Sequence, residues 1–224
     1  MPDNVILLTG FEPFGGEKVN PSILGCRELD GRRFNNCYVK VEEVPLRFEE
    51  IRGTIEALIE KYTPAAVICT GQGSGSWLNL ERIAINVADA TRVSYNCGAK
   101  PSDVTLVEES PAAYFTKLPI RRLLYKIREG GVPAEISNSA GAFGCNQIFY
   151  HLMDYIASKK LDIPAGFIHV PKLPEQVVET REPHMTLSLI VRGLEIIVED
   201  ISGNLQDTGS YLNQHAQRVS GSPL

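Results

Sequence analysis

The stretch RFEEIRGTIEALIEKYTPAAVICTG, residues 47–71, contains both kinds of element from which the chain is built. Its first part places apolar residues at the spacing of one helix face, at Phe48, Ile51, Ile55, Leu58 and Ile59. Its second part, AAVICTG, is apolar almost throughout, which is typical of a strand buried on both faces of a sheet. An amphipathic helix followed by a fully buried strand predicts an α/β fold.

The same alternation extends over most of the chain. We predict further strands at VILLTG, CYVKVEEVPL, LERIAINVA, PAEISNSAG and AGFIHVP. We predict further helices at PSILGCREL, PIRRLLYKIREGG, CNQIFYHLMDYIASKK and TLSLIVRGLEIIVEDISGN. The segment 89–116 is expected to hold loops and an edge hairpin. The pattern therefore predicts a single three-layer α/β/α domain over residues 1–204, with a twisted, mostly parallel central sheet.

The last residues, 205–224, are polar, and we expect them to be disordered or to serve assembly contacts. A net charge of -5 without a lysine or arginine block argues against a nucleic-acid binder or a protein of anionic membrane surfaces. The sequence has no apolar run of the ~20 residues needed to span a bilayer. It also has no basic region before its short N-terminal apolar run, so we predict a cytoplasmic protein.

The five cysteines show neither a disulfide framework nor a zinc-like spacing with the four histidines. We therefore predict free thiols, most of them packed as small apolar residues, and no metal site. We likewise predict no cofactor. The remaining question is whether any single cysteine has a chemical role.

Cys145 stands in SNSAGAFGCNQIFYHLMDY, residues 137–155, where a glycine-rich turn becomes a helix. It could be a buried packing residue, because free cysteine is often fully buried. It could also be a nucleophile, because a helix N-terminus lowers a thiol's pKa. Ligands of open α/β sheets bind beyond the carboxyl ends of strands, and the turn before Cys145 is one of four such loops. The others follow VILLTG, AAVICTG and GFIHVP.

Two residues are candidates to assist such a thiol. His169 lies at the end of the strand AGFIHVP, and a histidine there could be a hydrogen-bonded core residue or a general base. Glu81 begins an otherwise apolar stretch and could orient the imidazole, or could instead pair with Arg82 or Arg92 or lie in solvent. Spacing alone does not choose between these roles.

The glycine-rich loops GFEPFGG and GQGSGSW do not match phosphate-binding motifs. Neither contains a full G-x-G-x-x-G followed by a helix, and neither has a P-loop lysine. We therefore do not predict a nucleotide site. Of the other aromatic and imidazole residues, His151 and His184 are expected at surface or packing positions, and Trp77 and Tyr95 at the surface or an interface.

Four segments together resemble the signatures of the pyroglutamyl-peptidase I family: TGFEPFGGEKVNPS, ERIAIN, SAGAFGCN and GFIHVPKLP. They occur in the family's order between about residues 7 and 174. The resemblance implies a three-layer cysteine peptidase that removes N-terminal pyroglutamate without metal or cofactor. It also implies a cytosolic homotetramer.

The resemblance assigns a catalytic set of Glu81, Cys145 and His169. It further implies a substrate pocket, whose matching positions are Phe11, Phe14, Asn20, Gln72, Arg92 and Phe143. Two departures concern this pocket. The family commonly has threonine, an aromatic residue and valine before the nucleophile, whereas this chain has Ala142, Phe143 and Gly144. An arginine often follows the second glycine of the segment that here reads GQGSGSW.

Two other function classes compete with a peptidase. A nucleoside phosphorylase or related glycosyl transferase can use a similar three-layer fold, but it would need a phosphate cradle and not Cys145. A binding protein that has lost activity could keep the pocket without the catalytic set. Thiol alkylation distinguishes them, because only the peptidase hypothesis predicts that modifying one cysteine stops turnover.

Overall fold

A central sheet of seven strands organises the computed structural model, which describes residues 4–205. The strands run in the spatial order β2-β3-β1-β4-β9-β5-β8. Their bounds are β1 Asn4–Phe11, β2 Arg33–Phe34, β3 Cys37–Val44, β4 Ala66–Gln72, β5 Leu78–Glu81, β8 Ala134–Ser137 and β9 Ala165–Val170. β1, β3, β4 and β9 are mutually parallel, so the prediction of a mostly parallel sheet is confirmed.

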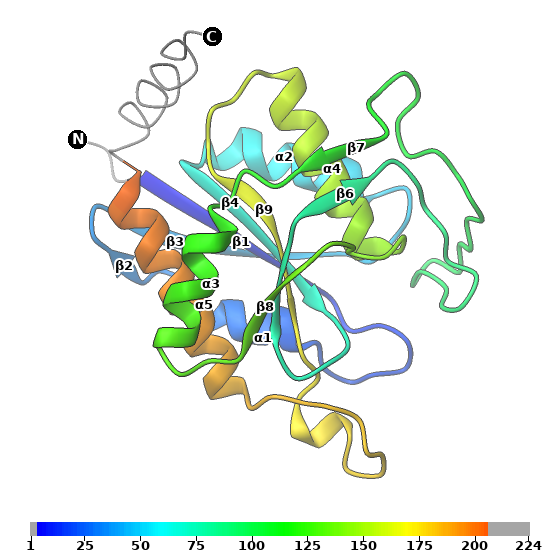
Figure 1. Cartoon of the computed structure of the whole chain (residues 1–224). Helices are drawn as coiled ribbons and strands as arrows, with labels where there is room; N and C mark the ends of the chain where they lie inside the picture. The colour runs from blue at the N-terminus through cyan, green and yellow to red at the C-terminus, as the bar shows by residue number, and fades with distance from the viewer. Residues whose placement is uncertain (1–3, 206–224) are drawn as a thin grey trace, which may run out of the picture.

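Helices cover both faces of this sheet (Figure 1). One layer consists of α1 (Pro21–Arg27), α3 (Ile120–Glu129) and α5 (Leu187–Asn204), and α5 contacts both of the others. The second layer consists of α2 (Ile51–Tyr62) and α4 (Gly144–Ser158), which pack on each other. The predicted α/β class with three layers is thus confirmed.

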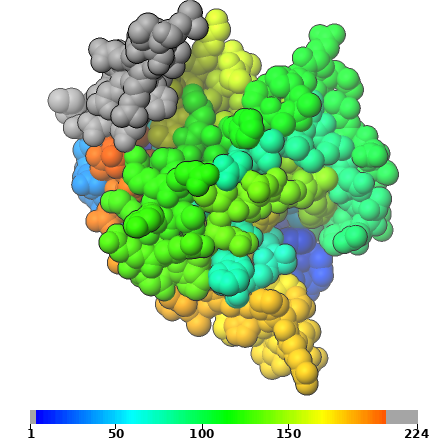
Figure 2. All heavy atoms as spheres, in the orientation of Figure 1, coloured from blue at the N-terminus to red at the C-terminus, as the bar shows by residue number. Residues whose placement is uncertain are grey.

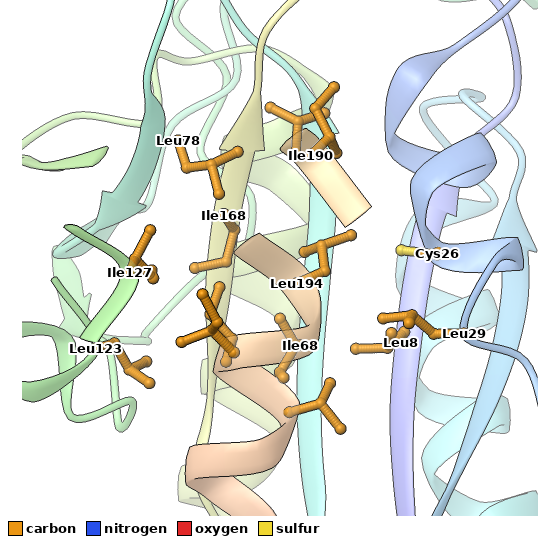
Figure 3. Close-up of a cluster of buried hydrophobic side chains, with 14 of the residues drawn as sticks. Leu8, Cys26, Leu29, Ile68, Leu78, Leu123, Ile127, Ile168, Ile190 and Leu194 are labelled. Atoms are coloured by element: carbon orange, nitrogen blue, oxygen red, sulfur yellow. The ribbon is translucent and has the colours of Figure 1, made fainter. Parts of the chain in front are cut away.

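Successive residues of the central strands point into two separate cores. On β4, Ile68 belongs to the core under α1, α3 and α5, whereas Val67 and Cys69 belong to the core under α2 and α4. On β9, Ile168 and Phe167 divide in the same way. Figure 3 shows the first core, where Ile68 and Ile168 meet Leu194 of α5 and its neighbours. This alternation explains why these strands are apolar throughout, because both of their faces are buried.

β5 and β8 run in the opposite direction to the four parallel strands β3, β1, β4 and β9, as the short edge strand β2 also does. β5 pairs with β9 in antiparallel register, with Asn79 opposite His169, and β8 is parallel to β5. The loop after β8 therefore does not leave the sheet at the edge where β1, β4 and β9 end. α4 instead brings its N-terminus to that edge, because it connects back to the start of β9.

The predicted strand LERIAINVA is two strands in the structure. β5 ends at Glu81, and β6 (Ile83–Ile85) pairs with β7 (Ala113–Phe115) in a separate antiparallel ribbon. The chain leaves the main sheet at Arg82, whose N–H donates to Ser137 O and whose carbonyl accepts from Thr116 N. The edge hairpin expected within residues 89–116 is therefore not formed there: β7 lies in that segment, but its partner β6 precedes it and belongs to the stretch predicted as one strand.

Helix α2 begins at Ile51, later than the sequence pattern suggests, since residues 48–50 form a turn that precedes it. A short 3-10 helix, η1 (Pro174–Gln176), follows β9. The predicted tail lies outside the described residues except for Leu205. No helix within residues 4–205 is long and apolar enough to cross a membrane.

Candidate active site

Antiparallel pairing of β5 with β9 brings Glu81 to His169. Since Asn79 is opposite His169, Glu81 is its diagonal neighbour on the same face of the sheet. His169 Nδ1 donates a hydrogen bond to Glu81 Oε1 at 2.8 Å. Glu81 is 1% exposed, so this carboxylate is bound to the imidazole and not to solvent. Among the ion pairs of residues 4–205, Glu81 pairs with His169 and not with Arg82 or Arg92.

Cys145 is the second residue of α4, directly after the glycine-containing turn. It is buried, with 9% of its surface exposed, and it interacts with the imidazole of His169. Phe143 is the helix N-cap and no side chain caps this helix end. The sulfur is therefore carried by the first turn of the helix, where the backbone N–H groups lack helical partners and the positive end of the helix dipole lies.

The pKa of His169 lies well above its ordinary value. Burial by itself lowers that pKa, because it penalises the imidazolium. The charge of Cys145 and its hydrogen bond, together with the Glu81 carboxylate, act in the opposite direction and outweigh burial. Cys145 and Glu81 thus both act to raise the pKa of the imidazole.

The glycines of TGQG leave room for these two catalytic candidates. A Cβ atom on Gly71 would lie 2.7 Å from Cys145 Sγ and 2.8 Å from Phe167 Cζ. A Cβ atom on Gly73 would lie 2.9 Å from Cβ and Cγ of His169. Both distances are shorter than real side chains tolerate, so any larger residue would displace the sulfur or the imidazole. Close approach of side chains, rather than a phosphate, accounts for these glycines.

Aromatic rings form a wall beside Cys145. The ring of Phe143 lies 6.1 Å from that of Phe14 and 4.5 Å from that of Tyr95, measured between centroids. Phe11 is buried below, with Cδ2 3.5 Å from the Cβ position of Gly71. The three predicted pocket aromatics therefore lie close to Cys145, the predicted nucleophile.

The remaining predicted pocket residues lie in other surroundings. Asn20 caps α1: its Oδ1 accepts from the N–H and hydroxyl of Ser22, and its Nδ2 donates to Glu12 O. Gln72 is half-buried at the end of β4, and its Oε1 accepts a hydrogen bond from Gln176 Nε2. Arg92 is exposed on the segment between β6 and β7. The structure thus ties Asn20 to the backbone and leaves Arg92 at the surface.

The other thiols and imidazoles have no place in this constellation. All five cysteines are free; Cys26, Cys37 and Cys69 are buried, and Cys97 is exposed. Burial raises the pKa of Cys26 and of Cys69 to about 12, which keeps both thiols protonated. His151 is buried, as a packing residue would be, and His184 is exposed at the surface. No group of three or more metal-ligating side chains occurs in the part of the chain that the structure describes.

The family model for pyroglutamyl peptidase matches residues 4–204. The chain belongs to this family. A pyrrolidone-carboxylate peptidase of Bacillus licheniformis is 43% identical over 192 residues, which are 85% of this chain and 89% of the relative. The resemblance identified from the four motifs is thus confirmed, and so is the enzyme class, pyroglutamyl-peptidase I.

Solved structures of the pyroglutamyl peptidase family have the same fold. Pyroglutamyl peptidase I of Bacillus amyloliquefaciens matches with a TM-score of 0.87 and 37% identity, over 90% of this chain and 98% of that one. A mutant pyrrolidone carboxyl peptidase from Pyrococcus furiosus matches with a TM-score of 0.86 and 36% identity, over 90% and 99% of the two chains.

At Gly144, one of the positions where this chain departs from the family pattern, a neighbouring side chain fills the available space. A Cβ atom at position 144 would lie 2.3 Å from Leu46 Cδ1 and 3.6 Å from Tyr95 Cε1. The Leu46 side chain therefore occupies the space that a larger residue at 144 would take. The space next to Gly144 and Cys145 is thus filled by a side chain from the loop after β3.

Two residues of this site escaped the sequence analysis. Tyr95 is 1% exposed and not a surface aromatic, because it is sandwiched between Phe143 and Phe48. Leu46 follows β3, whose carboxyl end reaches the same edge as β1 and β4, so the rule for open sheets could have nominated its loop. For Tyr95 the sequence offered no signal, since it lies in a segment without periodicity.

We expect Gly73→Ala to lower kcat by about 100-fold or more, because the new methyl group displaces the His169 imidazole. Kinetics with a fluorogenic pyroglutamyl amide, beside thermal unfolding, measures this. Gly53→Ala is the matched control: Gly53 is in α2 with no atom within 4 Å of its Cβ position, so activity should stay at the wild-type level. Normal kcat in Gly73→Ala would show that the imidazole position is not restricted by this backbone.

Proposed function

We propose that this enzyme removes an N-terminal pyroglutamyl residue from peptides by acyl transfer to the thiolate of Cys145. The observation that carries the proposal is the Glu81–His169 hydrogen bond beside a cysteine at a helix N-terminus, in a chain of the pyroglutamyl peptidase family. His169 acts as acid and base, and Glu81 holds its tautomer and stabilises its charged form.

The first half of the reaction forms a thioester. The Cys145 thiolate attacks the pyroglutamyl carbonyl carbon, and the bond to the leaving amine breaks as the His169 imidazolium gives that nitrogen a proton. In the second half, His169 takes a proton from water, whose oxygen attacks the thioester. The products are free pyroglutamate and the regenerated thiolate–imidazolium pair.

Backbone N–H groups of the first turn of α4 are suited to stabilise the oxyanion. The helix has no side-chain cap, so the N–H groups at Gly144 and Cys145 are not bound by a capping side chain. Their dipoles are fixed in direction before substrate binds, which is the arrangement that stabilises developing negative charge most effectively.

The aromatic wall suits a flat, uncharged lactam. Glu12 is the acid nearest in sequence to Phe11 and Phe14, but its Oε1 accepts hydrogen bonds from Leu46 N and Asn96 Nδ2. This carboxylate is therefore engaged in joining loops and not in receiving a substrate ammonium group. Burying an unpaired charge against Phe143 would be costly, so charged N-termini should be excluded.

Glycosyl transfer gains no support from the glycine-rich loop, because Cys145 and His169 pack against its glycines. The family resemblance also implies a cytoplasmic location and a homotetrameric assembly. Both stay predictions, and we include them in the proposal. Asn20, Gln72 and Arg92 stay predicted substrate-binding residues; Gln72 would reach the lactam through its amide group.

Cys145→Ala should abolish turnover and leave the fold intact, because only this thiol meets the imidazole. Alanine at Cys26, Cys37, Cys69 or Cys97 should keep most of the activity. Hydrolysis of a pyroglutamyl coumarin amide and circular dichroism measure the two properties. Iodoacetamide should inactivate the wild type through Cys145, and it should inactivate Cys97→Ala, which lacks the exposed thiol, in the same way. Wild-type-like turnover by Cys145→Ala would falsify the mechanism.

Glu81→Gln should lower kcat by up to about 10⁴-fold, since the imidazole loses its orienting charge. The raised pKa of His169 means that its acid form persists at neutral pH and is lost only as pH rises through that pKa. Removing the Glu81 charge lowers this pKa, so the alkaline limb of kcat/KM should move to lower pH. The pH profiles of both enzymes measure the shift, and an unmoved limb together with a loss below about tenfold would assign the orienting role elsewhere.

The kcat/KM for a pyroglutamyl amide should exceed that for the matching prolyl amide by up to about 10⁴-fold. Proline lacks the lactam carbonyl and carries a charged nitrogen, which the aromatic wall does not accommodate. Glutaminyl and glutamyl amides should also be poor substrates, because each of them carries a charged N-terminal nitrogen. Comparable values for pyroglutamyl and prolyl amides would show that the lactam is not recognised.

A further inference from the structure

A pocket of about 210 Å³ opens beside His169, apart from the aromatic wall. Three segments line it: the loop 72–75 after β4, Lys172 directly after β9, and residues 182–183 of the segment that returns toward α5. In Figure 2 the teal surface after β4 and the gold surface after β9 are neighbours on the same face. None of these residues except Gln72 has a place in the proposed catalytic or pyroglutamyl-binding set.

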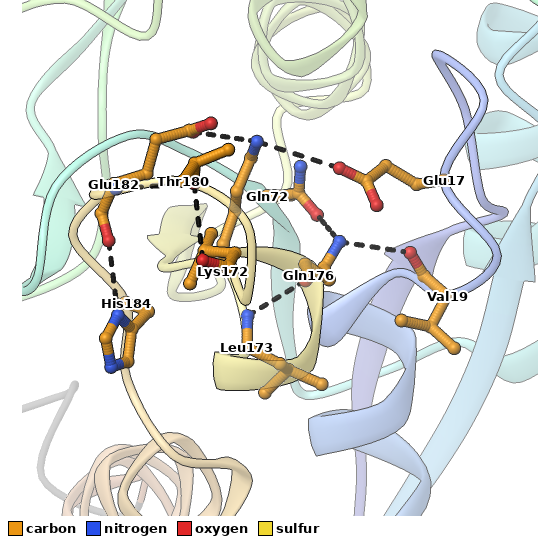
Figure 4. Close-up of polar contacts among 10 residues, drawn as sticks. Glu17, Val19, Gln72, Lys172, Leu173, Gln176, Thr180, Glu182 and His184 are labelled. Atoms are coloured by element: carbon orange, nitrogen blue, oxygen red, sulfur yellow. Dashed lines mark hydrogen bonds and ion pairs between the residues drawn. The ribbon is translucent and has the colours of Figure 1, made fainter.

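Hydrogen bonds and ion pairs fix the walls of this pocket (Figure 4). Lys172 Nζ lies 2.8 Å from Glu182 Oε2 and 3.6 Å from Glu17 Oε1, and so joins the return segment to the loop after β1. Gln176 Nε2 donates to Gln72 Oε1 at 2.9 Å. Lys172 O accepts from Met185 N at 2.9 Å. The pocket is therefore a built part of the molecule.

The pocket lies on the side of the imidazole from which the leaving amine is protonated. His169 Nδ1 is bound to Glu81, so Nε2 is the nitrogen that exchanges protons with the reacting groups. Cδ2, the ring neighbour of Nε2, lies 3.0 Å from the Cβ position of Gly73, which lines the pocket. Since the pyroglutamyl ring faces Phe143, the chain beyond the scissile bond passes on the Gly73 side.

Lys172 and Glu182 are the charged residues that line this pocket, and Glu17, which pairs with Lys172 from outside the lining, gives the group of three a surplus of one negative charge. One lysine, Lys172, is paired with two carboxylates, Glu17 and Glu182. The side chain of Glu182 is 48% exposed, so it remains accessible to an incoming group. Its hydrogen bond with Lys172 lowers the pKa of Glu182, which keeps it ionised at neutral pH.

We infer that this pocket is the subsite for the side chain that follows pyroglutamate in the substrate, and that it favours a basic side chain over an acidic one. The inference rests on the proposed function, because it places the leaving part of a pyroglutamyl peptide. The first residue of that leaving peptide contacts the 72–75 loop, and Glu182 with Lys172 sets its charge preference.

The test compares kcat/KM for two peptide amides that differ at one residue, pyroglutamyl-lysyl-alanine and pyroglutamyl-aspartyl-alanine. The lysyl peptide should be cleaved roughly 3- to 10-fold more efficiently at low salt, as expected for a partly exposed charge interaction. The ratio should fall toward one in about 0.5 M salt, because salt screens such charges.

Two variants should move the ratio in opposite directions. Glu182→Gln removes the surplus negative charge and should bring the ratio toward one, whereas Lys172→Met releases both carboxylates and should increase it. A purely structural disturbance of the segment would shift the kcat/KM ratio of both variants in the same direction. Glu179→Gln is the matched control: it makes the same change at an exposed residue that does not line the pocket, and the ratio should stay unchanged.

A ratio of one in the wild type, or a shift of both variants in the same direction, would overturn the subsite. A pyroglutamyl coumarin amide separates this result from failure of the proposed function. If the wild type hydrolyses that amide but does not distinguish the two peptides, only the subsite is wrong. If it hydrolyses neither the amide nor the peptides, the proposed function itself fails.

Discussion

The hydrogen bond between Glu81 and His169 depends on one feature of the sheet, the antiparallel pairing of β5 with β9. All other strands next to β9 and β4 are parallel, and their carboxyl ends deliver loops to one edge. Because β5 is reversed, Glu81 on this neighbouring strand lies beside the imidazole of His169 within the sheet itself. A carboxylate on a strand is held more rigidly than one on a loop, which suits a group that must orient a histidine.

Space around the pair is limited by the same packing. Gly71 and Gly73 on β4 and its loop let the sulfur and the imidazole approach the backbone, while Leu46 occupies the space next to Gly144. The site is therefore bounded by main chain at Gly71 and Gly73 and by the side chain of Leu46 next to Gly144. In such close packing, addition of a single methyl group is enough to move a reacting atom.

Charge is distributed differently in the two parts of the site. Aromatic rings gather at Phe14, Tyr95 and Phe143, and the neighbouring acid Glu12 is engaged with Leu46 and Asn96. On the side of Gly73 the structure places Lys172 between two carboxylates, Glu17 and Glu182. This division corresponds to the chemistry of a pyroglutamyl peptide, whose first residue is uncharged and whose following residues vary.

The sequence by itself determined the layers of the fold, because apolar strands and amphipathic helices have periods that follow from local geometry. It also determined the candidates Cys145, His169 and Glu81 through the motifs that carry them. Only the tertiary structure decided that β5 is reversed, that Tyr95 is buried against Phe143, and that Asn20 is bound to the backbone. These are contacts between residues distant in sequence, and no local periodicity encodes strand direction or the packing of an irregular segment.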